Sequence, residues 1–195
     1  MALRQVLATV SPLLPQARVG LRAAGVPFVD ERVTFAELPA LKASGTLPLG
    51  QLPVLSVGDA TFCQSVPLSR YACRLAGLYP TDALAALAAD EVVATIDEVW
   101  CKVPGKDEGL RVAYANEVAP KYLAALTKRL GSATFFGGAS PNWADLWMYQ
   151  YVQFFTSGFF DFIPKDFVEK AAPALAKLAA AVKASDLYAK FGTPE

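Results

Sequence analysis

The residues best suited to bind a ligand lie between Leu47 and Tyr71, in the segment LPLGQLPVLSVGDATFCQSVPLSRY. Pro53 precedes the hydrophobic run VLSV, and because proline has no backbone N–H it cannot complete a ladder with a neighbouring strand. Gln64 and Ser65 stand where the next helix is expected to begin, and the first amides of a helix lack partners within it. Backbone groups at both places can contact a ligand, so the segment is predicted to be a binding site.

The composition excludes several kinds of chemistry. The chain of 195 residues contains no histidine, which removes Ser-His-Asp hydrolysis, His-dependent zinc catalysis and most haem ligation. Its three cysteines, Cys63, Cys73 and Cys101, lack C-x-x-C spacing. Such a set favours reduced thiols over a disulfide framework or a zinc site. We therefore expect a cytoplasmic protein without a metal.

Charge and hydropathy exclude nucleic-acid and membrane partners. Lys and Arg together number 18, as do Asp and Glu, so no net field attracts a polyanion. Polar residues interrupt the most hydrophobic tract, and no run of about 18 apolar residues remains to span a bilayer. Pro12 and Pro15 interrupt the N-terminal segment, so a secretion signal is not expected.

The first part of the chain alternates strand and helix patterns. A helical stripe that ends at Gly25 and a hairpin turn at Gly58-Asp59 help to predict the order β-α-β-α-β-β-α. One parallel crossover followed by a hairpin is typical of a thioredoxin-like α/β domain. The predicted elements are strands in 4–10 and 27–35, helices in 16–25 and 66–76, a short helical or irregular connector in 36–45, and the hairpin in 52–65.

The second part of the chain has helical spacing throughout. After a first helix that begins near Leu84, helical segments occupy 110–131, 142–155 and 166–191. This succession predicts an all-α helical bundle. Gly and Pro near 78–81 mark a boundary between an N-terminal domain, 1–78, and a helical domain, 82–195. The apolar stripe predicted for the first helix of the bundle consists of Leu84, Leu87, Val92, Ile96 and Val99.

Four segments have the sequence and the spacing of a known family. They are AGVPF at 24–28, GQLPVL at 50–55, QSVPLSRY at 64–71 and NWADLWM at 142–148. In these segments the chain resembles the cytosolic glutathione transferases, most nearly the sigma-type group, over most of its length. The resemblance implies the architecture of that family, a thioredoxin-like domain followed by a helical bundle, and makes glutathione the expected ligand.

The resemblance assigns roles to the predicted binding segment. Pro53 is expected to follow a cis peptide bond that turns the backbone of Leu52 outward, to pair with the cysteinyl backbone of glutathione. A plain trans turn proline is the alternative. Gln64 and Ser65 are expected to bind the γ-glutamyl carboxylate at the positive end of the helix. Alternatively, Ser65 serves only as an N-cap.

Three further residues are implied by their positions in the family pattern. Lys42 is expected to pair with the glycyl carboxylate and Gln51 to frame the peptide, although each also fits an ordinary surface side chain. Asp97 lies on one helix face with Asp90, which by itself fits a solvated charged stripe. The resemblance instead implies a homodimer in which Asp97 reaches the γ-glutamyl ammonium of glutathione bound to the partner subunit.

The expected catalytic segment departs from the sigma-type pattern. A tyrosine hydroxyl normally stabilises the glutathione thiolate there, and Leu7 stands at that position. Ser11 resembles the Ser-Pro start of the classes that use serine, and is the expected donor, with Thr9 as the second candidate. A hydroxyl that donates to sulfur lowers the thiol pKa from about 8.5. Alternatively, Ser11 only opens a turn before Pro12.

The last of the four segments predicts the start and the core of a central helix. Asn142 and Asp145 have capping-box spacing. The aromatic residues that follow are expected to fill the bundle core, with at most a few lining the acceptor pocket. They are Trp143, Trp147, Tyr149, Tyr151, Phe154, Phe155, Phe159 and Phe160.

The resemblance implies a detoxifying enzyme that conjugates the glutathione thiolate to small hydrophobic electrophiles, chiefly by holding the two reactants together. The absence of the tyrosine leaves a second interpretation open, a non-catalytic glutathione-binding module that serves as a ligand carrier or assembly domain. A third is a glutathione-dependent reductase or peroxidase. Such an enzyme would turn over a hydroperoxide but not a chloroarene.

Overall fold

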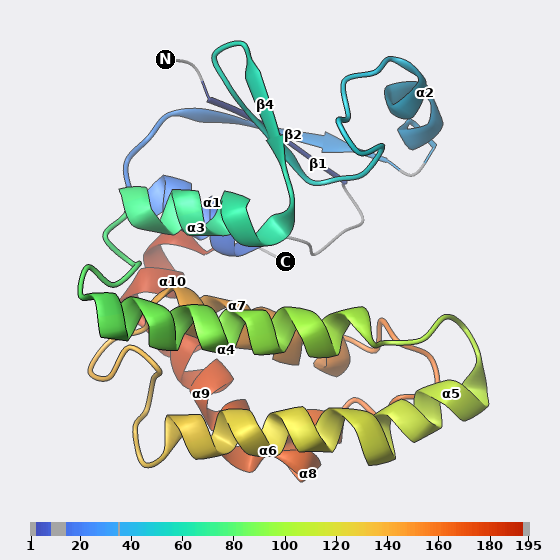
Figure 1. The fold of residues 1–195 in the computed structure, drawn as a ribbon, viewed down its shortest axis with the longest axis vertical. Helices are drawn as coiled ribbons and strands as arrows, with labels where there is room; N and C mark the ends of the chain where they lie inside the picture. The colour runs from blue at the N-terminus through green and yellow to red at the C-terminus, as the bar shows by residue number, and fades with distance from the viewer. Residues whose placement is uncertain (1–2, 9–14, 35, 193–195) are drawn as a thin grey trace. The chain divides into compact units, whose positions relative to one another are not determined.

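The computed structural model describes residues 3–8, 15–34 and 36–192 (Figure 1). The chain divides into two compact units, Met1–Leu78 with Phe191–Glu195, and Tyr79–Lys190. The sequence predicts a helical domain that continues to residue 195, whereas Phe191 and Gly192 group with the first unit. A hydrogen bond accounts for part of this grouping, because Arg22 Nη1 donates to the carbonyl oxygen of Gly192 at 3.2 Å.

The first unit has the predicted β-α-β-α-β-β-α order. Its strands form one sheet in the order β2-β1-β3-β4, in which β1 and β2 are parallel and the other neighbours are antiparallel. The thioredoxin-like α/β prediction is confirmed. The elements are β1 (Leu3–Ala8), α1 (Pro15–Ala23), β2 (Phe28–Val33), α2 (Leu38–Ala43), β3 (Val54–Val57), β4 (Ala60–Cys63) and α3 (Ser65–Leu75).

Helices α1 and α3 pack on the same face of this sheet (Figure 1). Gly20 on α1 permits their close approach. A Cβ at this position would lie 2.8 Å from the carbonyl carbon of Ala72 and 2.9 Å from the amide nitrogen of Cys73. The buried residues that join the two helices to the sheet are Ala17, Leu21, Leu55, Leu68 and Ala72.

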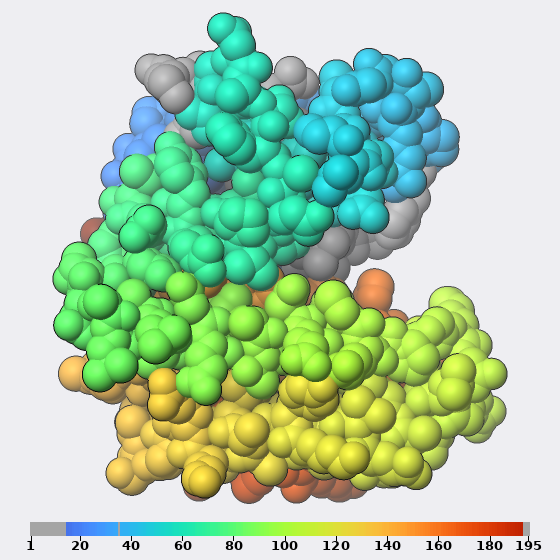
Figure 2. Space-filling view, in the orientation of Figure 1, coloured from blue at the N-terminus to red at the C-terminus, as the bar shows by residue number. Residues whose placement is uncertain are grey.

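The second unit is built from helices, as predicted. Helices α4 and α6 lie side by side and form much of the face of this unit seen in Figure 2. The elements are α4 (Ala83–Cys101), α5 (Glu108–Ala113), a π-helix (Tyr114–Val118), α6 (Ala119–Leu130), α7 (Trp143–Thr156), α8 (Phe167–Ala171), α9 (Pro173–Ala184) and α10 (Asp186–Phe191).

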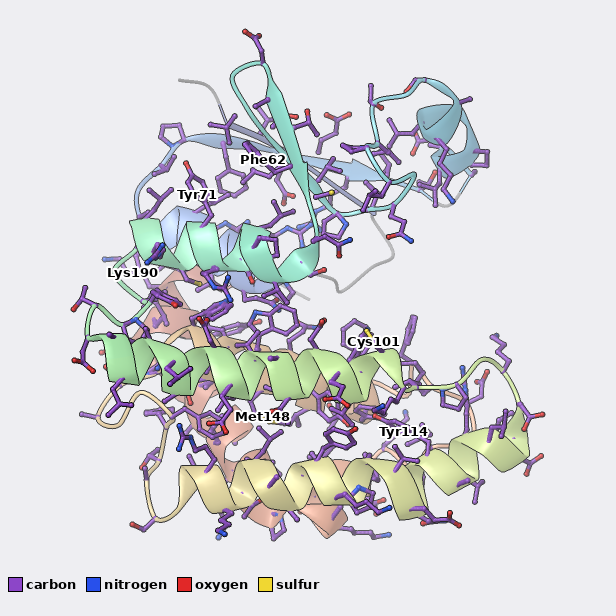
Figure 3. All side chains as sticks on the ribbon, in the orientation of Figure 1. Phe62, Tyr71, Cys101, Tyr114, Met148 and Lys190 are labelled. Carbon is purple, nitrogen blue, oxygen red and sulfur yellow. The ribbon has the colours of Figure 1, made fainter. Side chains whose placement is uncertain are left out.

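The π-helix interrupts the segment predicted as one helix over 110–131. Its first residue, Tyr114, lies between α4 and α6 (Figure 3). The Tyr114 hydroxyl lies 3.1 Å from the carbonyl oxygen of Val99, to which it donates, and 2.9 Å from the Tyr151 hydroxyl. Burial raises the pKa of Tyr114 to about 12, so this buried pair is neutral and satisfied inside the bundle.

Helix α7 is the centre of the second unit, and its capping box is confirmed. Asn142 Oδ1 accepts from the Ala144 amide at 2.8 Å, while Asp145 Oδ2 accepts from the Asn142 amide at 2.9 Å. The aromatic residues predicted for the core are buried except Phe159, for which the prediction is wrong. This side chain is 52% exposed. Helix α7 ends at Thr156, and in the loop that follows the chain buries Phe160 instead.

Helix α4 buries a different stripe from the one predicted. Val92, Ile96 and Val99 are buried, but Leu84 and Leu87 are 73% and 64% exposed. Nine residues separate Leu87 from Ile96, which at about 100° per residue places the two on opposite sides of the helix. The prediction that Leu84 and Leu87 belong to the core is therefore wrong.

Candidate functional site

The strand register brings the two predicted binding segments together at one end of the β3–β4 hairpin. Val54 pairs with Cys63 at this end, so Pro53 precedes one strand where Gln64 follows the other. Leu52 and Ser65 are one residue further from the pair on each side. The residues predicted from sequence therefore meet at one edge of the sheet.

The backbone before β3 is held by apolar contacts. The peptide bond between Leu52 and Pro53 is cis, as the resemblance implied, and the trans alternative is wrong. Pro53 is buried and Leu52 is half-buried. Leu52 packs on a buried cluster of Val33, Leu47 and Val54, which fixes this edge of the hairpin against the sheet.

Gln64 has an unusual backbone conformation. Its φ of 76° and ψ of 126° lie outside the regions that residues with a Cβ ordinarily occupy. Such a residue costs on the order of 1–3 kcal/mol and is concentrated at ligand and active sites. Gln64 holds the N-cap position of α3, and in the part of the chain that is described its side chain makes no capping hydrogen bond. The alternative that Ser65 is the N-cap is therefore wrong, because Ser65 is the first residue of the helix.

The first turn of α3 presents two amides. The Leu68 amide donates to the carbonyl oxygen of Gln64 at 3.2 Å, and the amides of Ser65 and Val66 precede this first intrahelical bond. Pro67 has no N–H to add. These two amides, the half-buried Ser65 side chain and the positive end of the helix dipole can together bind an anion.

Helix α2 brings Lys42 towards the same end of the sheet. Leu38 and Leu41 pack on the cluster that also contacts Leu52, and Lys42 follows them as an exposed side chain. Gln51 directly precedes Leu52 and is also exposed. Within the described ranges, no hydrogen bond joins Lys42 or Gln51 to the start of α3. The two side chains are therefore placed near the site by the backbone and not by a direct contact.

The predicted catalytic segment begins at this edge as well. Val6 pairs with Val54, and β1 continues past this pair to Ala8, which pairs with Val33. The two candidate donors, Thr9 and Ser11, lie outside the described residues. Their role therefore stays a prediction.

Asp97 lies on α4 in the second unit, whereas the hairpin end belongs to the first unit. It is half-buried, and burial raises the pKa of its carboxyl group. Asp90 has a structural partner, because the Tyr79 hydroxyl donates to Asp90 Oδ2 at 3.0 Å. Asp97, unlike Asp90, therefore remains the candidate for a ligand contact on this face.

Two of the three cysteine thiols, those of Cys73 and Cys101, are poorly suited to act as nucleophiles. Cys101 ends α4 and is exposed (Figure 3), but partial burial and the nearby Asp97 carboxylate raise its pKa. Cys73 is fully buried, which raises its pKa further. A raised pKa lowers the thiolate fraction of both residues, so neither is a good candidate for the reactive sulfur.

The residues that the structure describes contain no group of three or more histidine, cysteine, aspartate or glutamate side chains that could hold a metal ion. None of the helices formed by these residues is both long enough and apolar enough to cross a bilayer.

Comparisons with known proteins identify the family. A family model described as "Glutathione S-transferase, C-terminal domain" matches residues 95–191. Glutathione S-transferase 1 of Ascaris suum is 32% identical over 143 residues, which cover 67% of this chain and 68% of that protein. The chain belongs to the glutathione S-transferase family.

Two further proteins are similar to this chain. Hematopoietic prostaglandin D synthase of Gallus gallus is 32% identical over 130 residues, which cover 64% of each chain. The match thus spans slightly less than two thirds of this curated relative. The solved structure of prostaglandin synthase D of Nilaparvata lugens shares the fold, with a TM-score of 0.83 and 21% identity over 100% of both chains.

Two features of this candidate site were missed from sequence. The Val66 amide was not singled out, although its position between Ser65 and Pro67 was a usable signal, since Pro67 leaves Val66 as the last donor before Leu68. The left-handed conformation of Gln64 had no such signal, because glutamine shows no preference for positive φ.

Proposed function

We propose that this chain binds glutathione and transfers its thiolate to small hydrophobic electrophiles, as a cytoplasmic enzyme of detoxification. One observation carries the proposal. At the hairpin end, buried Pro53 and strained Gln64 hold the Leu52 backbone and the first amides of α3 at one edge of the sheet. Membership of the glutathione S-transferase family supports glutathione as the ligand of this edge.

The binding mode follows from the groups available. The γ-glutamyl carboxylate accepts from the Ser65 and Val66 amides and from the Ser65 hydroxyl, and each charge-assisted bond contributes about 1.5–3 kcal/mol. The cysteinyl backbone pairs with Leu52 in the manner of an added strand. Lys42 then pairs with the glycyl carboxylate, with Gln51 alongside the peptide.

Exposed aromatic side chains on the second unit support a hydrophobic acceptor. Phe159 is 52% exposed, and its ring centroid lies 5.1 Å from that of Phe160. Trp100 is half-buried and lies 5.5 Å from Phe160. We define these three residues as the aromatic surface. Phe159 and Trp100 provide its accessible apolar area, and the buried Phe160 joins them.

A homodimer is proposed because both units expose large apolar side chains. Phe62 and Tyr71 (Figure 3) are 53% and 39% exposed on β4 and α3, and Leu75 is 45% exposed. Leu87 is exposed on α4, the helix that carries Asp97. Exposed apolar residues of this kind mark contact surfaces. In the proposed dimer, Asp97 of the partner subunit meets the γ-glutamyl ammonium of bound glutathione.

The function is tested by calorimetry with reduced glutathione followed by turnover assays. We expect saturable binding below millimolar ligand, and conjugation of a chloronitroarene. Binding without turnover would favour the non-catalytic carrier or assembly module. Turnover of a hydroperoxide alone would favour the reductase or peroxidase. No heat with millimolar glutathione would contradict all three glutathione-dependent functions.

Replacing Ser11 by alanine tests the thiolate donor. A hydroxyl that donates to sulfur lowers the thiol pKa, so its loss is expected to raise the pKa of bound glutathione by about one unit, or about 1.4 kcal/mol. The measurement is the thiolate absorbance of bound glutathione as a function of pH. Thr9→Val is the matched control, and an unchanged titration in Ser11→Ala with a shifted one in Thr9→Val would move the role to Thr9.

A further inference from the structure

Arg111 on α5 is a buried cation that the proposed glutathione site does not use. The residue is only 5% exposed. Its Nε donates to the carbonyl oxygens of Gly105 at 2.9 Å and of Pro104 at 3.4 Å. Its Nη1 donates to the carbonyl oxygen of Asp161 at 3.1 Å. Arg111 therefore joins two loops, 102–107 and 157–166, that are far apart in sequence.

The same guanidinium contacts Phe160, the buried member of the aromatic surface. Its central carbon lies 5.4 Å from the centroid of the Phe160 ring, within the range of a cation–π interaction. Phe160 in turn contacts both Trp100 and Phe159. A displacement of Arg111 would therefore reach the two outer members of the aromatic surface through one ring.

Arginine is better suited than lysine to join two loops and contact an aromatic ring at the same time. The guanidinium presents donors in a rigid planar fork and stacks on aromatic rings, whereas a lysine ammonium is a point charge on a flexible stem. Carbonyl oxygens of both loops accept hydrogen bonds from this one guanidinium, which fixes the loops relative to each other. An exposed ion pair between Lys106 and Asp161, at 3.6 Å, links the same loops at the surface and contributes little by comparison.

We propose that Arg111 is a positioning residue for the acceptor substrate. It holds Phe160, against which Trp100 and Phe159 pack edge-on at interplanar angles of 62° and 86°. Arg111 thereby fixes the exposed ring of Phe159, on which the planar conjugated part of an electrophile stacks. The inference rests on the proposed transferase function. It adds a preference for aromatic or extended conjugated acceptors over short aliphatic ones.

The first test compares Arg111→Gln and Arg111→Lys with a surface control. The control is Arg129→Gln, because Arg129 is an exposed arginine paired with Glu91 at 2.9 Å. In Arg111→Gln we expect the KM for a chloronitroarene to rise about tenfold, the equivalent of one lost aromatic or cation–π contact. The KM values for glutathione and for a short aliphatic enal should change less than about twofold, and Arg111→Lys should be intermediate. Equal losses for both acceptors, or none, would overturn the proposal.

A second test does not require Arg111 variants to fold. Phe159→Leu removes a ring but keeps apolar area, and Phe162→Leu is its matched control in the same loop, since Phe162 is 50% exposed. Binding of an unreactive nitroarene is measured without glutathione by quenching of Trp100 fluorescence, with Trp100→Phe as the blank. We expect Phe159→Leu to weaken binding about fivefold or more and Phe162→Leu to leave it unchanged. Equal affinity in both variants would overturn the inference.

The same measurement separates the inference from the function on which it rests. Nitroarene binding with the expected variant pattern, in a protein that gives no heat with glutathione, would contradict the transferase and leave the aromatic surface standing. Glutathione binding with no quenching of Trp100 fluorescence by the nitroarene would contradict the role of the aromatic surface and leave the proposed function standing.

Discussion

A Ser65→Asp variant is expected to lose glutathione binding while it gains thermal stability. Helix α3 has no acidic residue in its first turn, so a carboxylate there should stabilise the helix dipole by about 0.3–1 kcal/mol. The same carboxylate would lie beside the γ-glutamyl carboxylate of the ligand. Two such charges about 4 Å apart repel by about 4 kcal/mol at an effective dielectric constant of 20, which predicts a loss of at least about a hundredfold in affinity.

The matched control is Ser65→Asn, which has the size of aspartate without its charge. Asparagine removes the hydroxyl but leaves the helix amides available, so a loss of only about tenfold is expected. Calorimetry with glutathione checks the expected loss of affinity in each variant, and a thermal melt checks the expected gain of stability in Ser65→Asp. Equal affinity in the Asp and Asn variants would show that no anion binds at the start of α3.

Replacing Asp145 by alanine is expected to destabilise the helical unit severely. Its buried carboxylate accepts from the amides of Phe136 at 2.7 Å, Gly137 at 3.0 Å and Asn142 at 2.9 Å. Alanine would leave these donors without an acceptor, and each costs about 1–3 kcal/mol when desolvated. We expect a total loss of about 3–5 kcal/mol in urea unfolding. Asn142→Ala, which removes only the other half of the capping box, should cost about 1 kcal/mol.

The destabilisation by Asp145→Ala should also depend on pH. Burial raises the pKa of Asp145 to about 6, above its unfolded value of about 3.9. The folded protein therefore takes up a proton that the unfolded chain does not, and this contribution to stability is present at low pH and is lost as pH rises through 6. The difference between wild type and Asp145→Ala should be about 1 kcal/mol larger at pH 5 than at pH 7. A constant difference would contradict the raised pKa.

Local patterns were enough to predict the order of elements, but not how helices meet. Gly58-Asp59 and the strand runs on either side define the hairpin within a few residues. Tyr114 is the first residue of the π-helix, and the partners of its hydroxyl, Val99 and Tyr151, are 15 and 37 positions away in sequence, beyond the reach of a local pattern. Helical spacing likewise identifies apolar stripes without choosing the one that faces the core, which explains the errors at Leu84 and Leu87.

The candidate site divides in the same way. Pro53 and Ser65 were predictable because a proline before a strand and a helix start are local signals. Gln64 lies at the junction of β4 and α3, and no property of glutamine indicates its conformation. In the sequence Arg111 is one arginine among several. It could not be singled out, because its partner in the second loop, Asp161, is 50 positions away.

The absence of a side chain at Gly20 has a consequence for ligand binding. Backbone of α3 lies against this glycine at Ala72 and Cys73, about two helical turns from Ser65. A methyl group introduced there would push α3, and the amides that we propose bind glutathione, away from Leu52. Under the proposed function, affinity for glutathione would therefore be lost through a change at a position that has no side chain.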